Sequence, residues 1–249
     1  MHVVCSYGWV SKGSSEAVVV SLSPEKREVC ARDGCALAGH LTFTLSEDSS
    51  NFIESDVTVS GGTLSNWSAA SSTSYSATFT PTADSTTNGV ISVASSKFSD
   101  SAGNTNNDGS DANNAVSLSV DTVRPSFSSA ATSTDGAKVV LSYDETLSST
   151  TAPTSAFAVT TDGAANAVTA VSNDGATSEL TLTNTIKANQ AVTVAYNDPS
   201  SSDDANAVQD SAGNDAVSFS STTVTNNSTI PAASTGGSDL IPNTPTTSK

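Results

Sequence analysis

The chain has 249 residues, of which 36% are hydrophobic and 14% charged, and its formal net charge is −16 at pH 7. Such an acidic surface repels nucleic-acid phosphates and anionic lipids, so we expect no nucleic-acid partner. No stretch approaches the ~18 consecutive apolar residues that a transmembrane helix needs, so we expect no membrane insertion. Acidic surfaces favour solubility and attract cations.

Residues 1–40 differ in kind from the rest of the chain. They hold all three cysteines and both histidines, and their acidic and basic residues balance, so the net charge falls on residues 41–249. They lack the basic-then-apolar layout of a secretory signal. Cys30 and Cys35 could form half a zinc site, but this pair alone is a weak signal. We interpret residues 1–40 as an atypical leader, unrelated to the body or poorly ordered.

Short stretches of alternating apolar and polar residues begin at Leu41. LTFTLS places Leu41, Phe43 and Leu45 on one face, and DVTVS, SYSATFTP, GVISVAS and AVSLSV follow the same pattern. A period of two over short segments predicts half-buried strands. Segments rich in Ser, Gly, Asn and Asp separate them and predict turns.

The pattern resumes after the segment DTVRPS, where Pro125 suits a passage between domains because proline cannot donate to a central ladder. AKVVLSY, FAVTT, AVTAVS, SELTLTN, AVTVAYND and AVSFSSTTV then predict a second set of strands. The predicted fold is therefore all-β, with two tandem Ig-like antiparallel β-sandwich domains at residues 41–122 and 123–226. Residues 227–249 are predicted to be a flexible linker or tail.

The pentapeptide DSAGN occurs at Asp100–Asn104 and again at Asp210–Asn214, each time shortly before the last strand of a half. LTFTLSED likewise resembles VVLSYDET in the second half. Gly103 and Gly213 can adopt positive φ, and the flanking Asp and Asn can cap a turn with their side chains. This explanation needs no ligand.

The same acidic loops also suggest a calcium site. Calcium takes six to eight oxygen ligands in a flexible geometry, and the spacing here is not that of an EF-hand. The candidate ligands, with the first loop and the following Asp121 favoured over the second half, are Asp100, Asn104, Asn106, Asp108, Asp111, Asp121, Asp198, Asp203, Asp204, Asp210 and Asn214. Whether these loops bind calcium or are only solvated turns stays open at this point.

Several of these segments resemble known repeats. LTFTLSEDSSNFIESD, SYSATFTPTAD, FSDSAGN and SLSVDTVRP resemble the bacterial Ig-like repeats of giant secreted adhesins. The stretch from AVTAVSNDGATSELTLTN to VQDSAGNDAVSFSSTTV resembles the repeat of the cyanobacterial swimming-associated cell-surface protein. The resemblance implies tandem Ig-like sandwiches, location outside the cell or on its surface, and a spacer or adhesive role. Calcium between neighbouring domains is a further implication, with Asp100, Asn104 and Asp121 the best-matching positions.

One departure concerns the first domain, for which the family expects a strand upstream of LTFTLS. Residues 1–40 supply no matching one, although AVVVSL (Ala17–Leu22) could replace it. Otherwise an edge of the sheet stays open, which invites aggregation. The sequence is also consistent with a fragment of a larger gene, or with a remnant that has no function.

The body has no catalytic pattern. Residues 41–249 contain no His or Cys for a nucleophile–base relay, and no GxSxG, P-loop or HExxH motif occurs. We therefore expect no enzyme but a surface or secreted spacer or adhesion module, whose partners are neighbouring Ig-like repeats. The alternative is a module that binds glycans or cell-surface polymers, with Trp67 and Tyr75 as a stacking platform; for Trp67 we favour partial burial.

Overall fold

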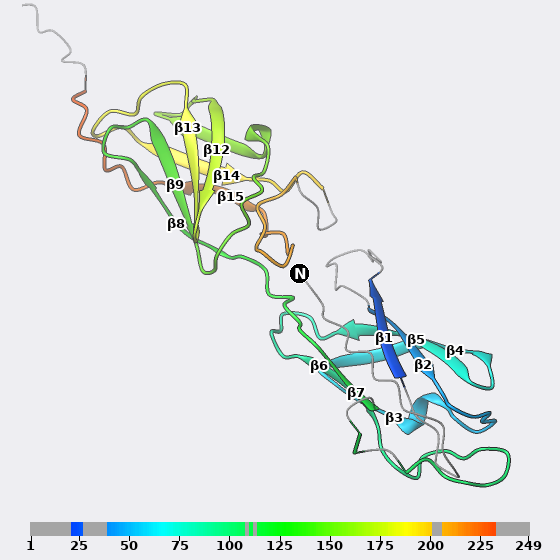
Figure 1. The fold of residues 1–249 in the computed structure, drawn as a ribbon. Coiled ribbons are helices and arrows are strands. Elements are labelled where there is room, and N and C mark those ends of the chain that lie inside the picture. Colours follow the sequence, from blue (N-terminus) through cyan, green and yellow to red (C-terminus); the bar gives the residue numbers. More distant parts are fainter. Residues whose placement is uncertain (1–20, 27–38, 108–109, 112–113, 201–205, 233–249) are drawn as a thin grey trace, which may run out of the picture.

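The computed structural model describes residues 21–26, 39–107, 110–111, 114–200 and 206–232, and the account below concerns these ranges. They form two successive groups of β-sheets joined by the segment that follows β7 (Figure 1). The two helices in these ranges are three-residue 3-10 turns, η1 (Glu54–Asp56) and η3 (Thr154–Ala156). No helix among the described residues has the length and apolar character required to cross a bilayer. The predicted all-β class is confirmed.

The first group consists of a four-stranded and a three-stranded antiparallel sheet. The larger sheet has the order β1-β2-β5-β4 and the smaller one β3-β6-β7. Their strands are β1 (Ser21–Lys26), β2 (Gly39–Thr44), β3 (Val57–Ser60), β4 (Gly62–Ser71), β5 (Ser74–Pro81), β6 (Gly89–Val93) and β7 (Ala115–Leu118). Every second residue of β2, β5 and β6 points inward, so Phe43, Phe79 and Ile91 share one buried core.

A strand from the leader completes the edge of the larger sheet. All six residues of β1 pair with β2, from Ser21 opposite Thr44 to Lys26 opposite Gly39. The sequence analysis proposed Ala17–Leu22 for this place. The described strand shares Ser21 and Leu22 with that proposal, and residues 17–20 lie outside the described ranges. Because β1 covers β2, the edge that the sequence left open is paired.

The second group repeats this plan with two four-stranded sheets. Their orders are β12-β13-β9-β8 and β11-β10-β14-β15. The strands are β8 (Phe127–Thr132), β9 (Lys138–Tyr143), β10 (Phe157–Thr161), β11 (Ala164–Ala165), β12 (Val168–Asp174), β13 (Thr177–Leu182), β14 (Val192–Tyr196) and β15 (Phe219–Thr223). Leu141, Leu180 and Val194 come from both sheets and lie in a single buried cluster, as expected for a sandwich.

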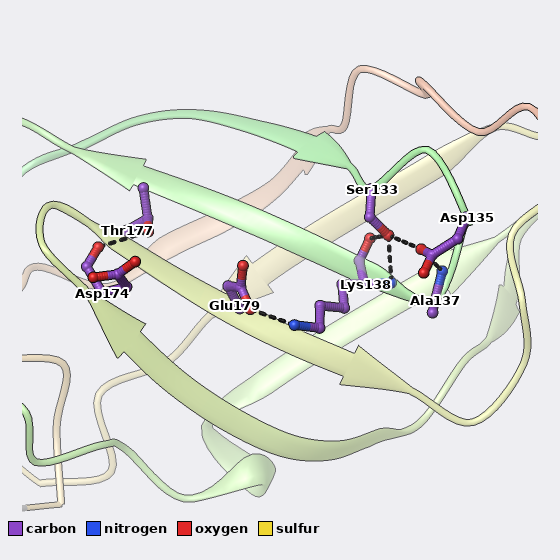
Figure 2. Close-up of polar contacts among 7 residues, drawn as sticks. All are labelled: Ser133, Asp135, Ala137, Lys138, Asp174, Thr177 and Glu179. Atoms are coloured by element: carbon purple, nitrogen blue, oxygen red, sulfur yellow. Dashed lines mark hydrogen bonds and ion pairs between the residues drawn. The ribbon is translucent and has the colours of Figure 1, made fainter.

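The outer face of the β9–β13 pair is polar. Lys138 on β9 forms an ion pair with Glu179 on β13, and both side chains are partly exposed (Figure 2). In the turn before β9, the hydroxyl of Ser133 donates to Asp135, whose carboxylate also accepts from the Ala137 main chain. The alternation seen in the sequence therefore separates a small apolar core from a face of Thr, Ser and charged residues.

The chain beyond β15 is held against the start of the same domain. The main-chain N–H of Thr132 donates to the carbonyl of Thr225 at 2.9 Å, and the N–H of Thr225 donates to Ala130 at 2.9 Å. This is a parallel contact between Ala131 and Thr225. The hydroxyl of Ser228 donates to the carbonyl of Ile186 at 2.7 Å. Thus residues 227–230, predicted as the start of a flexible tail, make specific hydrogen bonds; the domain boundaries themselves stay a prediction.

Gly136, in the turn before β9, lies in a closely packed part of the second sandwich. Its φ is +65°, and a Cβ built there would lie 2.0 Å from the Ile186 carbonyl oxygen. We expect Gly136→Ala to lower the free energy of unfolding of this domain by about 3 kcal/mol or more, since a clash adds to the backbone strain. Gly175→Ala is the matched control. Gly175 has φ +54° but no neighbour within 4 Å, so only the left-handed penalty of about 1–2 kcal/mol applies. Equal losses in urea denaturation would contradict the packing argument.

Candidate metal centre

Three carboxylates converge where the linker meets the second sandwich. Asp121, Glu145 and Asp210 each offer an oxygen, and these oxygens lie within 4.8 Å of one another. They come from three separate segments, namely the segment after β7, the turn after β9 and the second DSAGN turn. Hard oxygen ligands of this kind suit calcium, for which three carboxylates would be part of a set of six to eight.

The second DSAGN turn fixes Asp210, which is 2% exposed. Its Oδ1 accepts hydrogen bonds from the main-chain N–H groups of Ala212, Gly213 and Asn214 at 2.7–2.9 Å. Its Oδ2 accepts from the side-chain amide of Asn214 at 2.7 Å. Gly213 has φ +95°, which the turn requires. The structural explanation for the recurrence of DSAGN is therefore confirmed: the aspartate organises the turn.

Glu145 is the carboxylate that the sequence analysis missed. It lies in the turn that follows β9, two positions after the buried Tyr143. Its Oε1 is enclosed and accepts no hydrogen bond from the described residues. Burial raises the pKa of Glu145 from its usual 4.5 to about 7, and the charges of Asp210, Asp121 and Asp144 add to this effect. The ionised form of this group is thus disfavoured unless a positive charge joins it.

The linker beside this cluster is bound to both sandwiches. The side-chain amide of Asn214 donates to the main-chain carbonyl of Asp121 at 3.1 Å, which ties the linker to the second sandwich. The next residue, Thr122, is tied to the first. Its hydroxyl donates to the carbonyl of Thr82 at 2.8 Å, and its N–H donates to the carbonyl of Ser85 at 3.0 Å. Two adjacent residues therefore anchor to different domains.

Of the predicted ligands, the structure brings Asp121, Asp210 and Asn214 together. Asp100 and Asn104 form the equivalent turn of the first sandwich, and Asp121 lies with Asp210 instead of with them. Asp111 is exposed. The positions of Asp108, Asp203 and Asp204 lie outside the described residues.

Asn106 and Asp198 are used inside their own domains. Asn106 is fully buried, its amide oxygen accepts from Lys97 and Phe98, and its amide nitrogen donates to Ala94. These bonds hold the side chain against residues 94–98 of the first sandwich. Asp198 lies just after β14, and its Oδ1 accepts from the N–H of Ser200. Neither residue joins the carboxylate cluster.

The two residues considered for glycan stacking lie in an aromatic cluster. Tyr75 is 4% exposed, and its hydroxyl donates to the carbonyl of Ser49 at 2.8 Å. Trp67 is half-buried and contacts Phe43 and Phe52 with ring centroids 5.2 and 5.3 Å apart. Partial burial of Trp67 is confirmed, and the Tyr75 ring offers no open face for a sugar.

Comparisons with known proteins divide the chain at the linker. Residues 33–117 match the model of the bacterial Ig-like domain. Residues 120–201 match a model described as "Putative flagellar system-associated repeat". No curated protein matches the chain. The second match ends before Asp210 and β15, although both belong to the second sandwich. The two matched stretches are thus similar to a bacterial Ig-like domain and to a flagellar system-associated repeat, as the resemblance in the sequence predicted.

Proposed function

We propose that this chain is a non-enzymatic spacer or adhesion segment of a surface or secreted protein, and that a divalent cation, calcium by preference, stiffens the junction between its two sandwiches. One observation carries the proposal. The carboxylates of Asp121, Glu145 and Asp210 meet at a linker that is hydrogen-bonded to both domains. The partners would be further Ig-like repeats before and after this pair.

The electrostatics of the cluster support a cation. Three carboxylates within 4.8 Å repel one another, and a divalent ion would convert that repulsion into attraction. No donor in the described part of the chain bonds the enclosed Oε1 of Glu145, so coordination would supply a partner for it. Because Asp121 belongs to the linker while the other two belong to the second sandwich, an ion there would restrain the linker directly.

The lack of catalytic groups and the two family matches support the non-enzymatic part. Ig-like repeats are scaffolds, and any function must come from sites built on them. Residues 41–249 contain neither His nor Cys. Binding of glycans or surface polymers is the second hypothesis, and Trp67 would have to support it without Tyr75, which is buried.

Calcium is expected to stabilise the second sandwich. With a Kd of about 10⁻⁴–10⁻³ M, as in extracellular modules, a tenfold excess of calcium adds about 1.4 kcal/mol. For a domain of this size we expect Tm to rise by on the order of 5 °C or more. Differential scanning calorimetry of the full chain in EDTA and in about 10 mM calcium measures this shift.

Variants locate the effect. Asp121→Asn and Glu145→Gln should abolish the calcium-dependent rise, whereas Asp111→Asn, which removes an exposed carboxylate of the first loop, should retain it. If Asp111→Asn removed the rise and Glu145→Gln did not, the ion would lie in the first loop. If wild-type Tm did not change and calorimetric titration detected no bound calcium, the stiffening proposal would fail.

The raised pKa of Glu145 gives a pH dependence in metal-free buffer. A carboxyl whose pKa is higher in the folded state than in the unfolded chain destabilises the fold as it ionises, so stability falls from about pH 4.5 to about pH 7. Glu145→Gln removes this contribution, and its stability relative to wild type should therefore increase across that window. Urea denaturation at several pH values measures the difference, with Glu54→Gln, an exposed residue, as control. A difference that is constant with pH would show that Glu145 titrates normally.

A further inference from the structure

Three asparagines in the chain begin an Asn-x-Ser/Thr sequence, which is the acceptor pattern for N-linked sugars. They are Asn66, Asn226 and Asn227. In this pattern the side-chain amide nitrogen receives the sugar, and the transferase recognises the hydroxyl two positions later. A folded chain is therefore a substrate where both groups are accessible, and the three sequences differ in this respect.

The two sequences after β15 are held by hydrogen bonds within the second sandwich. The amide nitrogen of Asn226 donates to two main-chain carbonyls, both at 2.9 Å. The hydroxyls that a transferase would recognise, those of Ser228 and Thr229, each donate to a main-chain carbonyl, at 2.7 and 3.0 Å. Asn227 is exposed, but its sequence presents the Thr229 hydroxyl only when that bond breaks. We therefore expect neither site to be modified in the folded protein.

Asn66 lies in a β-bulge of β4. The register moves from Ser65 opposite Thr78 to Ser68 opposite Ser76, so two residues of β4 lie opposite one residue of β5. Asn66 has φ +53°, a left-handed conformation that asparagine adopts more readily than most residues. The bulge therefore takes this asparagine out of the regular ladder.

The two groups that the reaction needs are both exposed at the bulge. Neither Asn66 nor Ser68 is buried or half-buried. The Asn66 amide donates to the Thr78 hydroxyl at 3.3 Å, which is long for a hydrogen bond. Among the described residues the Ser68 hydroxyl makes no hydrogen bond. Of the three sequences, this one can meet a transferase without loss of a strong contact.

The position also suits a sugar because β4 lies at the edge of its sheet. Among the described strands β4 pairs with β5 alone. Residues Gly62–Ser71 contain no proline and no charged residue, which are common protections of an edge against pairing with another chain. A sugar is bulky and hydrated, so one at the bulge would supply that protection.

We propose that Asn66 is an acceptor site for N-linked glycosylation of the folded protein. Its amide nitrogen attacks the anomeric carbon of a glycosyl phosphate donor, the bond from that carbon to the phosphate oxygen breaks, and the phosphate leaves with the electron pair. The nitrogen gives up one proton to a basic group of the transferase. The donor is a lipid-linked oligosaccharide or a nucleotide sugar, which share this chemistry. The site goes beyond the proposed function, since it requires neither the cation nor the junction between the domains.

Enzymatic glycosylation of the folded full chain tests the proposal in two arms. One arm uses an oligosaccharyltransferase with a lipid-linked oligosaccharide, and the other a soluble N-glycosyltransferase with a nucleotide sugar. Intact-mass spectrometry and peptide mapping should find Asn66 modified in at least one arm, and the arm that succeeds identifies the donor. Absence of modification at Asn66 in both arms, or modification of Asn226 or Asn227 in its place, would overturn the proposal.

Variants make the outcome specific. Asn66→Asp removes the amide nitrogen and keeps a residue that tolerates positive φ, and Ser68→Ala removes the hydroxyl, so each should abolish the mass increase. Ser68→Thr keeps a hydroxyl and should retain it, which separates recognition from misfolding. Asn227→Asp, at an exposed asparagine outside the site, is the matched control and should behave as wild type. A mass increase that persists in Asn66→Asp would contradict the assignment. Because the melting test observes the junction, failure of the cation site and failure of the acceptor site are separate results.

Discussion

The hydrogen bonds accepted by the buried carboxylate of Asp210 are the constraint on which the junction depends. One oxygen gathers three main-chain N–H groups, so the turn closes without a ligand and leads the chain into the last part of the second sandwich. The other oxygen orients the amide of Asn214, and that amide holds the linker at Asp121. A charged group at this depth is costly unless several donors satisfy it, which explains why a chain poor in charge keeps an aspartate here. The carboxylates of Asp121 and Glu145 lie beside this fixed aspartate.

The stability of each sandwich comes from a thin core. Leu, Ile, Phe and Tyr supply more than half of the buried apolar side chains, among them Phe43, Phe79 and Tyr196, and Val and Ala supply the rest. Serine and threonine occupy the outer faces, where they satisfy sheet geometry without adding apolar surface. This composition explains the low apolar content of the sequence without recourse to disorder. The two domains follow the same plan of sheets and differ in their turns.

The strands could be predicted because period-two alternation depends on nearest neighbours along the chain. The DSAGN turn could also be predicted, since glycine at positive φ and a capping aspartate are local requirements. Only part of the carboxylate cluster could be predicted from the sequence. Asp121 and Asp210 were candidates, but nothing local indicates that the linker lies against the second turn instead of the first. Glu145 was missed because its place beside Asp210 arises from a bridge at Leu147, a contact between distant segments.

Burial also distinguishes between structural and ligand-binding roles that the sequence left open for some residues. Asn106 offers an oxygen of the kind that binds calcium, yet that oxygen accepts from the Lys97 N–H and the amide nitrogen donates to the Ala94 carbonyl. Tyr75 has the ring of a sugar platform, yet its hydroxyl is bonded inside the first sandwich. Residue type alone does not separate these roles, because each depends on where the rest of the chain runs.

The parallel contact between Ala131 and Thr225 has a mechanical consequence for a chain that is held at both ends. The first strand of the second sandwich and the segment that leaves it run side by side in the same direction, joined by two main-chain hydrogen bonds. Tension applied to the two ends of the domain would slide these segments past each other, so both bonds would bear the load together instead of opening one after the other. The exit from the fold therefore places these two hydrogen bonds in shear when the two ends of the domain are pulled apart.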